Sequence, residues 1–131
     1  MNAMSRETRE RILLAHGGGG VLMKELVSII VERLGRPGAD PLQDSATLAV
    51  GAGRIAFTTD SFVASPLTFP GGDIGRLAVC GTVNDLAVSG ARPAWLSLSF
   101  IIEEGFLFEE FARILDSIAD ASREAGVAIA T

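Results

Sequence analysis

The stretch FPGGDIGRLAVCGTVNDLAVSGARP, residues 69–93, decides the interpretation of the whole chain. Its opening proline and glycines are typical of a loop. Asp73 is a suitable N-cap for a helix that we expect over about 74–90, because an aspartate oxygen can accept hydrogen bonds from the free N–H groups of a first turn. Small and apolar residues dominate this helix, which ends at a glycine shortly before a proline. The pattern indicates a buried helix that nevertheless carries a carboxylate, Asp85.

Two further segments show the spacing of amphipathic helices. Residues 21–35 place leucine and isoleucine on one face, with the charged side chains mostly elsewhere. Residues 106–126 show the clearest apolar stripe, and Gly126 is a good residue to follow the last helical turn. The remaining apolar segments predict strands: 46–50, 54–63 (joined to the first by a Gly51-Ala52-Gly53 turn), one contained in 91–104 and one that starts at 127.

The order helix, strand, strand, helix, strand, helix, strand predicts an α+β fold, with helices on one face of a mixed or antiparallel sheet. Because the strands carry apolar side chains in both directions, we infer a homodimer that buries the second face of the sheet. A chain of 131 residues suits one domain. We assign residues 12–131 to it and expect residues 1–11 to form a flexible arm, with residues 1–3 left out of fold reasoning.

Composition limits the classes of partner. The net charge of −5 argues against a nucleic-acid or anionic-membrane surface, which would need clustered lysine and arginine. No apolar run is long enough for a transmembrane helix. The single cysteine, Cys80, rules out an intrachain disulfide framework and is expected to be a small buried hydrophobic residue. Together with the absence of a recognisable signal peptide, this indicates a cytoplasmic protein. Trp95 and the seven phenylalanines are most simply core residues.

Three aspartates stand among small or apolar neighbours rather than beside lysine or arginine. They are Asp44 before the first strand, Asp60 in or after the second, and Asp85 on the central helix. A carboxylate in such surroundings is costly unless a cation or hydrogen bonds compensate it. Mg²⁺ would do so, because it prefers carboxylate, water and phosphate oxygens. The alternative is structural: Asp44 caps a turn, Asp60 accepts backbone N–H groups, and Asp85 lies on a wet face.

The sequence HGGGG at 16–20 must interrupt any helix and offers free backbone N–H groups before the helix that follows. Such an arrangement commonly holds phosphate. It is not a P-loop, which would end in Gly-Lys-Ser/Thr. A flexible linker is the alternative, and a mobile segment of this kind could close over a nucleotide. His16, the single histidine, is most simply an ordinary polar residue.

Taken together, these motifs resemble the HypE family of hydrogenase maturation proteins, within the PurM-like ATP-binding superfamily. The matching stretches are AHGGGGVLMKELV (15–27), the long block FTTDSF to IIEEG (57–105) and EAGVAIAT (124–131). The pattern FPGG-x-IG-x-LA-x-CGT-x-ND-x-AVSGA-x-P within the block is specific, whereas the glycine run is not. Gly18 stands where the family usually has serine.

The resemblance implies a PurM N-terminal-like domain that pairs sheet to sheet and binds ATP near the dimer interface. Position by position, Asp44, Asp60 and Asp85 match the acidic residues that hold Mg–ATP in the superfamily, and Asn84 accompanies Asp85. Gly17, Gly18, Gly19 and Gly20 match the glycine segment near the phosphates.

The implied activity is the ATP-dependent dehydration of a thiocarboxamide on a C-terminal cysteine. The resulting thiocyanate supplies cyanide for the iron of [NiFe]-hydrogenase. The route implied is phosphorylation of the carbamoyl oxygen, which turns a poor leaving group into a good one, with Mg²⁺ neutralising the moving phosphoryl group. The implied partners are the carbamoyltransferase HypF and the HypC–HypD complex.

The chain departs from the family after 131, where a Gly-Asp-Thr segment with another acidic ligand would follow. The second domain and the acceptor cysteine are also missing, so we expect this chain alone not to complete the reaction. Two other interpretations stay open. One is another enzyme of the superfamily, of the thiamin-monophosphate kinase or selenophosphate synthetase type. The other is a non-catalytic dimerisation and docking platform, in which the acidic residues are structural.

Overall fold

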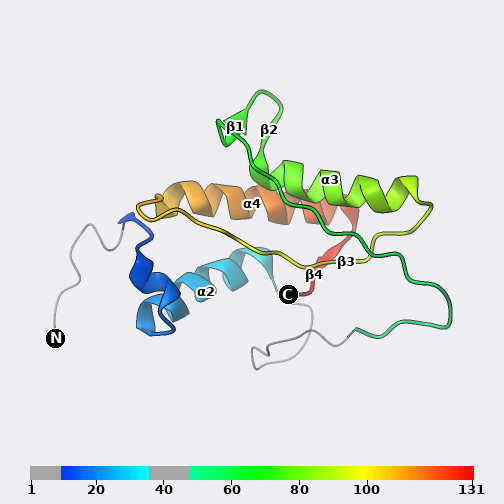
Figure 1. The fold of residues 1–131 in the computed structure, drawn as a ribbon, viewed down its shortest axis with the longest axis horizontal. Helices are drawn as coiled ribbons and strands as arrows, with labels where there is room; N and C mark the ends of the chain where they lie inside the picture. Colours follow the sequence, from blue (N-terminus) through cyan, green and yellow to red (C-terminus); the bar gives the residue numbers. More distant parts are fainter. Residues whose placement is uncertain (1–9, 36–47) are drawn as a thin grey trace.

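The computed structural model describes residues 10–35 and 48–131 (Figure 1). Within them the chain forms an α+β arrangement of helices and very short strands, which confirms the predicted fold class. No helix in the described ranges is long and apolar enough to cross a membrane. The elements in chain order are the 3₁₀ helix η1 (Leu14–Gly17), α2 (Val21–Leu34), β1 (Thr68–Phe69), β2 (Gly72–Asp73), α3 (Ile74–Val88), β3 (Trp95–Leu96), α4 (Phe108–Ala125) and β4 (Ala128–Ile129).

The three long helices begin and end close to where the sequence predicts, because their boundaries depend on local signals. Asp73 is the N-cap of α3, and its Oδ1 accepts a hydrogen bond of 2.8 Å from the backbone N–H of Arg76. Gly35 follows α2 with a φ of 71°. Gly126 follows α4 with a φ of 68° and a ψ of 29°, the left-handed conformation that glycine adopts without steric cost. The predictions for Asp73 and Gly126 are confirmed.

Helices α3 and α4 lie side by side and run in the same direction (Figure 1). Two polar contacts join them beyond the apolar packing. Ser117 of α4 donates a hydrogen bond of 2.7 Å to the capping carboxylate of Asp73. Arg76 pairs with Glu124 at 2.8 Å, and this hydrogen bond and charge raise the pKa of the guanidinium above its ordinary value. The start of α3 is therefore tied both to its own first turn and to the neighbouring helix.

The core is built around α4, which contributes the fully buried Phe111 and Leu115. One cluster joins α3 and α4 to the chain around β3 and β4, with Val79, Leu96, Ile114, Ile118, Ala121 and Val127 as its buried members. A second cluster joins α4 to α2 through Ile12, Phe111 and Leu115. Phe100 packs against both clusters. The helix with the clearest apolar stripe thus holds the other two helices and the strands together.

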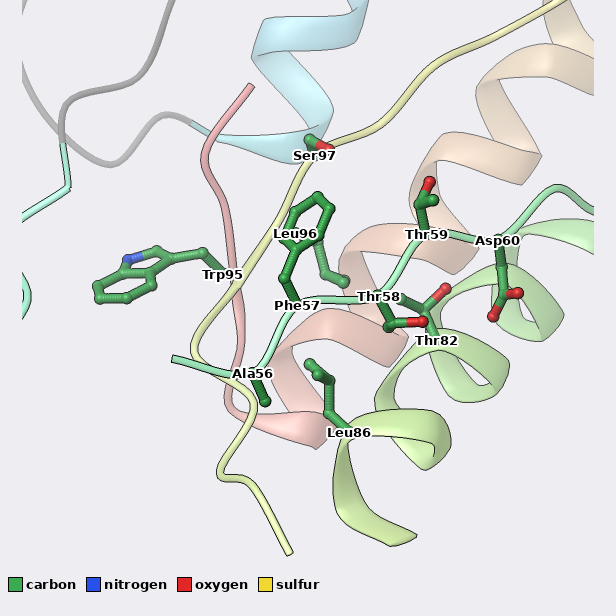
Figure 2. Close-up of a pocket in the computed structure, with 10 residues that line it drawn as sticks. All are labelled: Ala56, Phe57, Thr58, Thr59, Asp60, Thr82, Leu86, Trp95, Leu96 and Ser97. Carbon is green, nitrogen blue, oxygen red and sulfur yellow. The ribbon is translucent and has the colours of Figure 1, made fainter. Parts of the chain in front are cut away.

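The predicted strands are mostly wrong in extent. Of 91–104 only Trp95–Leu96 forms a strand, and it pairs in parallel with Ala128–Ile129. Hydrogen bonds extend this pairing, because the N–H of Leu98 donates to the carbonyl of Thr131. The described residues 48–50 and 54–63 form no strand, although the second segment is extended beside β3 (Figures 1 and 2). Apolar alternation describes which side chains face a core, but a strand also needs a partner edge for its N–H and C=O groups.

The extended segments leave one apolar surface uncovered in the single chain. Ile55, Phe57, Val63 and Ile101 are between 72% and 103% exposed. Side chains of this size are normally buried, and a concentration of them marks an interaction surface. These side chains are therefore available to a partner. The N-terminal arm predicted at 1–11 lies mostly outside the described residues, except that Arg11 pairs with Leu107 through an isolated backbone bridge.

Candidate functional site

A pocket of about 110 Å³ lies where the extended segment 54–63 crosses α3 and β3 (Figure 2). Three elements that are far apart in the sequence meet here. The lining residues are Ala56, Phe57, Thr58, Thr59, Asp60, Thr82, Leu86, Trp95, Leu96 and Ser97. Four hydroxyl groups and one carboxylate line it together with five apolar side chains, so the pocket offers several oxygen atoms as hydrogen-bonding groups or ligands.

Asp60 is the carboxylate of this pocket. It lies at the same end of the pocket as Thr82, whereas Trp95 lies at the opposite end (Figure 2). The Asp60 side chain is exposed and makes no hydrogen bond or ion pair with any described residue. The structural alternative, in which Asp60 accepts backbone N–H groups, is therefore not supported by the described part of the chain. A free carboxylate at the mouth of a polar pocket can accept a cation or a hydrogen-bond donor.

Helix α3 contributes two residues to the pocket, and the two polar residues that lie between them in sequence do not line it. Thr82 and Leu86 line the pocket, while Asn84 and Asp85 lie between them in sequence and are exposed. The expectation of a fully buried helix is therefore wrong for its C-terminal half. Only Gly75 and Val79, near its start, are buried. The carboxylate of Asp85 carries no desolvation cost in the single chain, and it makes no hydrogen bond or ion pair in the described part of the structure.

The glycine segment Gly17–Gly20 leads from η1 into the N-terminus of α2. Gly20 is the N-cap of α2, and its carbonyl accepts the N–H of Lys24. The N–H groups of the first turn have no partner in the helix itself, as at any helix N-terminus. A Cβ added to Gly17, Gly19 or Gly20 would meet no atom within 4 Å, so the surrounding protein does not require glycine for space. Gly19 alone in this segment has a positive φ, of 77°.

The proposed metal ligands are only partly testable in this structure. Asp44 lies outside the described residues. Among the residues that the structure describes, no group of three or more histidine, cysteine, aspartate or glutamate side chains could hold a metal ion. Asp60 lines the hydroxyl-bearing pocket, Asp85 follows the pocket residue Thr82 on α3, and hard oxygen donors of this kind suit Mg²⁺. The donor chemistry fits magnesium, with at most two protein carboxylates from the described part of the chain.

Sequence reasoning missed or misjudged four features of the chain. Trp95 is not a core residue but 38% exposed at the pocket. The hydroxyls of the pocket were not singled out, although the run FTTD places two threonines next to Asp60. His16 is 2% exposed, accepts a hydrogen bond of 2.9 Å at Nδ1 from the N–H of Leu13, and packs edge-on against a phenylalanine ring. Cys80 is half-buried rather than buried.

Comparisons with known proteins connect this geometry to a family. Residues 42–131 match the family described as AIR synthase related protein, N-terminal domain. The carbamoyl dehydratase HypE of Rhodobacter capsulatus is 50% identical over 127 residues, which cover 93% of this chain and 37% of the relative. HypE of Escherichia coli strain K12 is 47% identical over 126 residues, with 92% of this chain and 38% of the relative covered.

Solved structures give the same result. A crystal structure of the hydrogenase maturation protein HypE in complex with ATP superposes with a TM-score of 0.86 and 45% identity, covering 91% of this chain and 36% of that one. A HypE–HypF complex matches with a TM-score of 0.53 and 60% identity over 53% of this chain and 23% of that one. The chain spans little more than a third of the length of the relatives it matches. It belongs to the AIR synthase related protein family, has the N-terminal domain of that family, and is similar to HypE proteins over nearly all of its length.

Proposed function

We propose that this chain is the ATP-binding half of a cytoplasmic, HypE-type carbamoyl dehydratase that serves [NiFe]-hydrogenase maturation. The observation that carries the proposal is the similarity, over 91% of the chain, to a HypE that was solved with ATP. The hydroxyl-lined pocket and Asp60, which has no partner among the described residues, provide oxygen chemistry suited to a nucleotide and its cation. In the whole enzyme, the substrate is a thiocarboxamide on a C-terminal cysteine, which becomes a thiocyanate that supplies cyanide.

In this proposal Asp60 and Asp85 hold Mg²⁺, with Asp44 as a third ligand and Asn84 beside the nucleotide. The ion would neutralise charge on the transferred phosphoryl group. The chain's own residues would orient the triphosphate, because two carboxylates on separate elements, neither paired with a described residue, can fix an ion between them. Thr58 and Thr82 offer hydroxyls at the pocket. The Oγ1 of Thr82 donates to the carbonyl of Ala78, so its lone pairs stay available as acceptors.

In this proposal the glycine segment Gly17–Gly20 supplies backbone N–H donors to the phosphates, except for the N–H of Gly18, which already donates to the carbonyl of Ala15. The open space around Gly17, Gly19 and Gly20 supports this assignment, because a ligand can approach the backbone closely where no protein atom does. Gly18 has less room, since a Cβ there would lie 3.4 Å from the carbonyl oxygen of Ala15. A segment with this geometry can also close over a bound nucleotide.

The proposal includes assembly. The exposed side chains of Ile55, Phe57, Val63 and Ile101 form the surface that a second copy of the chain would cover. HypF is proposed as a partner because a HypE–HypF complex is among the similar structures. The HypC–HypD complex is proposed as the acceptor of the cyanide. No nucleic acid or membrane partner is proposed, since the net charge is −5.

Calorimetric titration of the chain with ATP in the presence and absence of Mg²⁺ tests the proposal. Asp60→Asn and Asp85→Asn are each expected to weaken Mg–ATP binding by roughly 10-fold or more, because hydrogen bonds and contacts to charged groups contribute about 1.5–3 kcal/mol. Asp120→Asn is the matched control. It removes the same charge from an exposed aspartate on α4, away from the pocket. Equal binding by the wild type and both site variants would favour the platform interpretation instead.

A further inference from the structure

The side chain of Phe62 rests directly on Gly81 of α3. An ideal Cβ built on Gly81 would lie 2.7 Å from Cζ and 2.8 Å from Cε1 of Phe62. The shorter distance is 0.7 Å less than the 3.4 Å at which ordinary van der Waals contact begins. Any side chain at position 81 would therefore push the ring away. Gly81 lies in the interior of α3, where glycine destabilises a helix by roughly 0.5–1 kcal/mol relative to alanine. The helix is therefore less stable locally than it would be with alanine, but the Phe62 ring can approach its backbone.

This contact joins the two elements that carry the proposed metal ligands. Phe62 and Asp60 are two residues apart on an extended segment, and alternate side chains of such a segment point to the same side. A ring of Phe62 that touches α3 therefore turns Asp60 toward the same helix. On α3, positions 81 and 85 are one turn apart on one face. The ring thus packs against α3 one turn before Asp85.

Among the described residues no hydrogen bond or ion pair holds either carboxylate. Segment 54–63 also forms no strand ladder in the described structure that could fix its position. The apolar contact at Gly81 is consequently one of the side-chain contacts that fix where Asp60 stands relative to α3, together with those around the pocket. Misplacement by about 1 Å can cost roughly 100-fold in a reaction that depends on orientation.

We propose that Phe62, seated on Gly81, is a positioning residue that sets the spacing of Asp60 and Asp85 for Mg–ATP. The proposal rests on the proposed function of that site, but its geometry can be tested separately. Gly81→Ala should displace the ring and with it Asp60. Phe62→Leu in the same chain should relieve the conflict, because leucine lacks the Cε and Cζ atoms that approach Gly81.

The experiment combines Mg–ATP calorimetry with ¹⁵N chemical shifts on the 131-residue chain. Gly81→Ala is expected to weaken Mg–ATP binding by roughly 10- to 100-fold, the loss of one contact to a charged group, and to shift the amide signals of Asp60 and Asp85. The double variant Gly81→Ala/Phe62→Leu is expected to recover most of the affinity, which gives a non-additive double-mutant cycle. Ile118→Val is the control for a general loss of stability. It trims a buried α4 side chain and should leave affinity and both amide signals unchanged.

The outcomes separate the two proposals. If Gly81→Ala binds Mg–ATP as the wild type does and the two amide signals do not move, the positioning role is refuted. A loss of affinity that leucine at 62 does not relieve also counts against it. If the wild type itself fails to bind Mg–ATP, the proposed function fails, and the amide shifts alone then decide whether the ring positions Asp60. Should Gly81→Ala not fold, Phe62→Leu alone removes the ring without a clash. Its Mg–ATP affinity and its Asp60 and Asp85 amide signals then decide in the same way.

Discussion

Two alanine substitutions in the glycine segment distinguish a phosphate-binding segment from a linker. At Gly17 an added Cβ meets no atom within 4 Å, and the backbone does not have a positive φ. Gly17→Ala should therefore stabilise the fold by about 0.4–1 kcal/mol, because alanine restricts the unfolded chain. For a domain of this size that is a rise in Tm of roughly 1–5 °C. At Gly19 the φ is 77°, so Gly19→Ala should instead cost about 1 kcal/mol net.

The two substitutions should have opposite effects on stability but the same effect on nucleotide binding. A methyl group at either position occupies the open space that the phosphates would use, and the loss of one or two charge-assisted hydrogen bonds corresponds to roughly 10- to 100-fold weaker binding. Differential scanning calorimetry and titration with Mg–ATP measure the two quantities on the same samples. If Gly17→Ala raises the Tm and leaves Mg–ATP affinity unchanged, the segment is a linker and the reasoning fails.

Three other predictions concern the cap of α3, the buried histidine and the uncovered surface. Asp73→Ala should lower the free energy of unfolding, measured by urea denaturation, by about 2–3 kcal/mol, because it removes both a helix cap and a hydrogen bond between helices. Ser117→Ala removes only the hydrogen bond between helices and should cost about 1 kcal/mol. Equal costs would contradict this division. His16→Ala should lower the free energy of unfolding by about 2–3 kcal/mol in the same assay. His16→Asn should lower it by clearly less, since asparagine can still accept a hydrogen bond from the backbone N–H of Leu13. An equal loss of stability in both variants would count against a role for this hydrogen bond. Ile101→Ser should raise the dissociation constant of the dimer, measured by sedimentation, by about 100-fold or more, because the side chain occurs twice in a symmetric interface. Leu14→Ser is the control: it removes an exposed apolar side chain at η1 and should leave the dissociation constant unchanged. A wild-type chain that is monomeric at micromolar concentration would refute the dimer.

The helices could be predicted from sequence because the forces that set them act within a few residues. The cap at Asp73, the glycine at 126 and the apolar spacing of α4 all operate within one or two turns. The strands could not be predicted in extent for the opposite reason. Segment 54–63 has the apolar alternation of a strand, but its backbone finds no strand partner among the described residues of the single chain.

The candidate site divides in the same way. Residue type and neighbours were enough to single out Asp60 and Asp85 as possible ligands, and the specific helix block was enough to indicate the family, which the comparisons confirm. The surroundings of the two aspartates were predicted wrongly. Their apolar neighbours in the sequence suggested burial, whereas both side chains are exposed. Burial depends on what other elements cover, and this is not encoded in the flanking residues alone.

By itself, the sequence determined the three helices, their caps, the α+β class and the identity of the acidic candidates, since each follows from local chemistry or from a contiguous motif. Only the tertiary structure decided that Asp60, Thr82 and Ser97 share one pocket, that Phe62 sits on Gly81, and that Trp95 faces outward while His16 is enclosed. These facts depend on contacts between residues from about 20 to 90 positions apart, whose proximity is set by the packing of whole helices around α4 and not by any local preference.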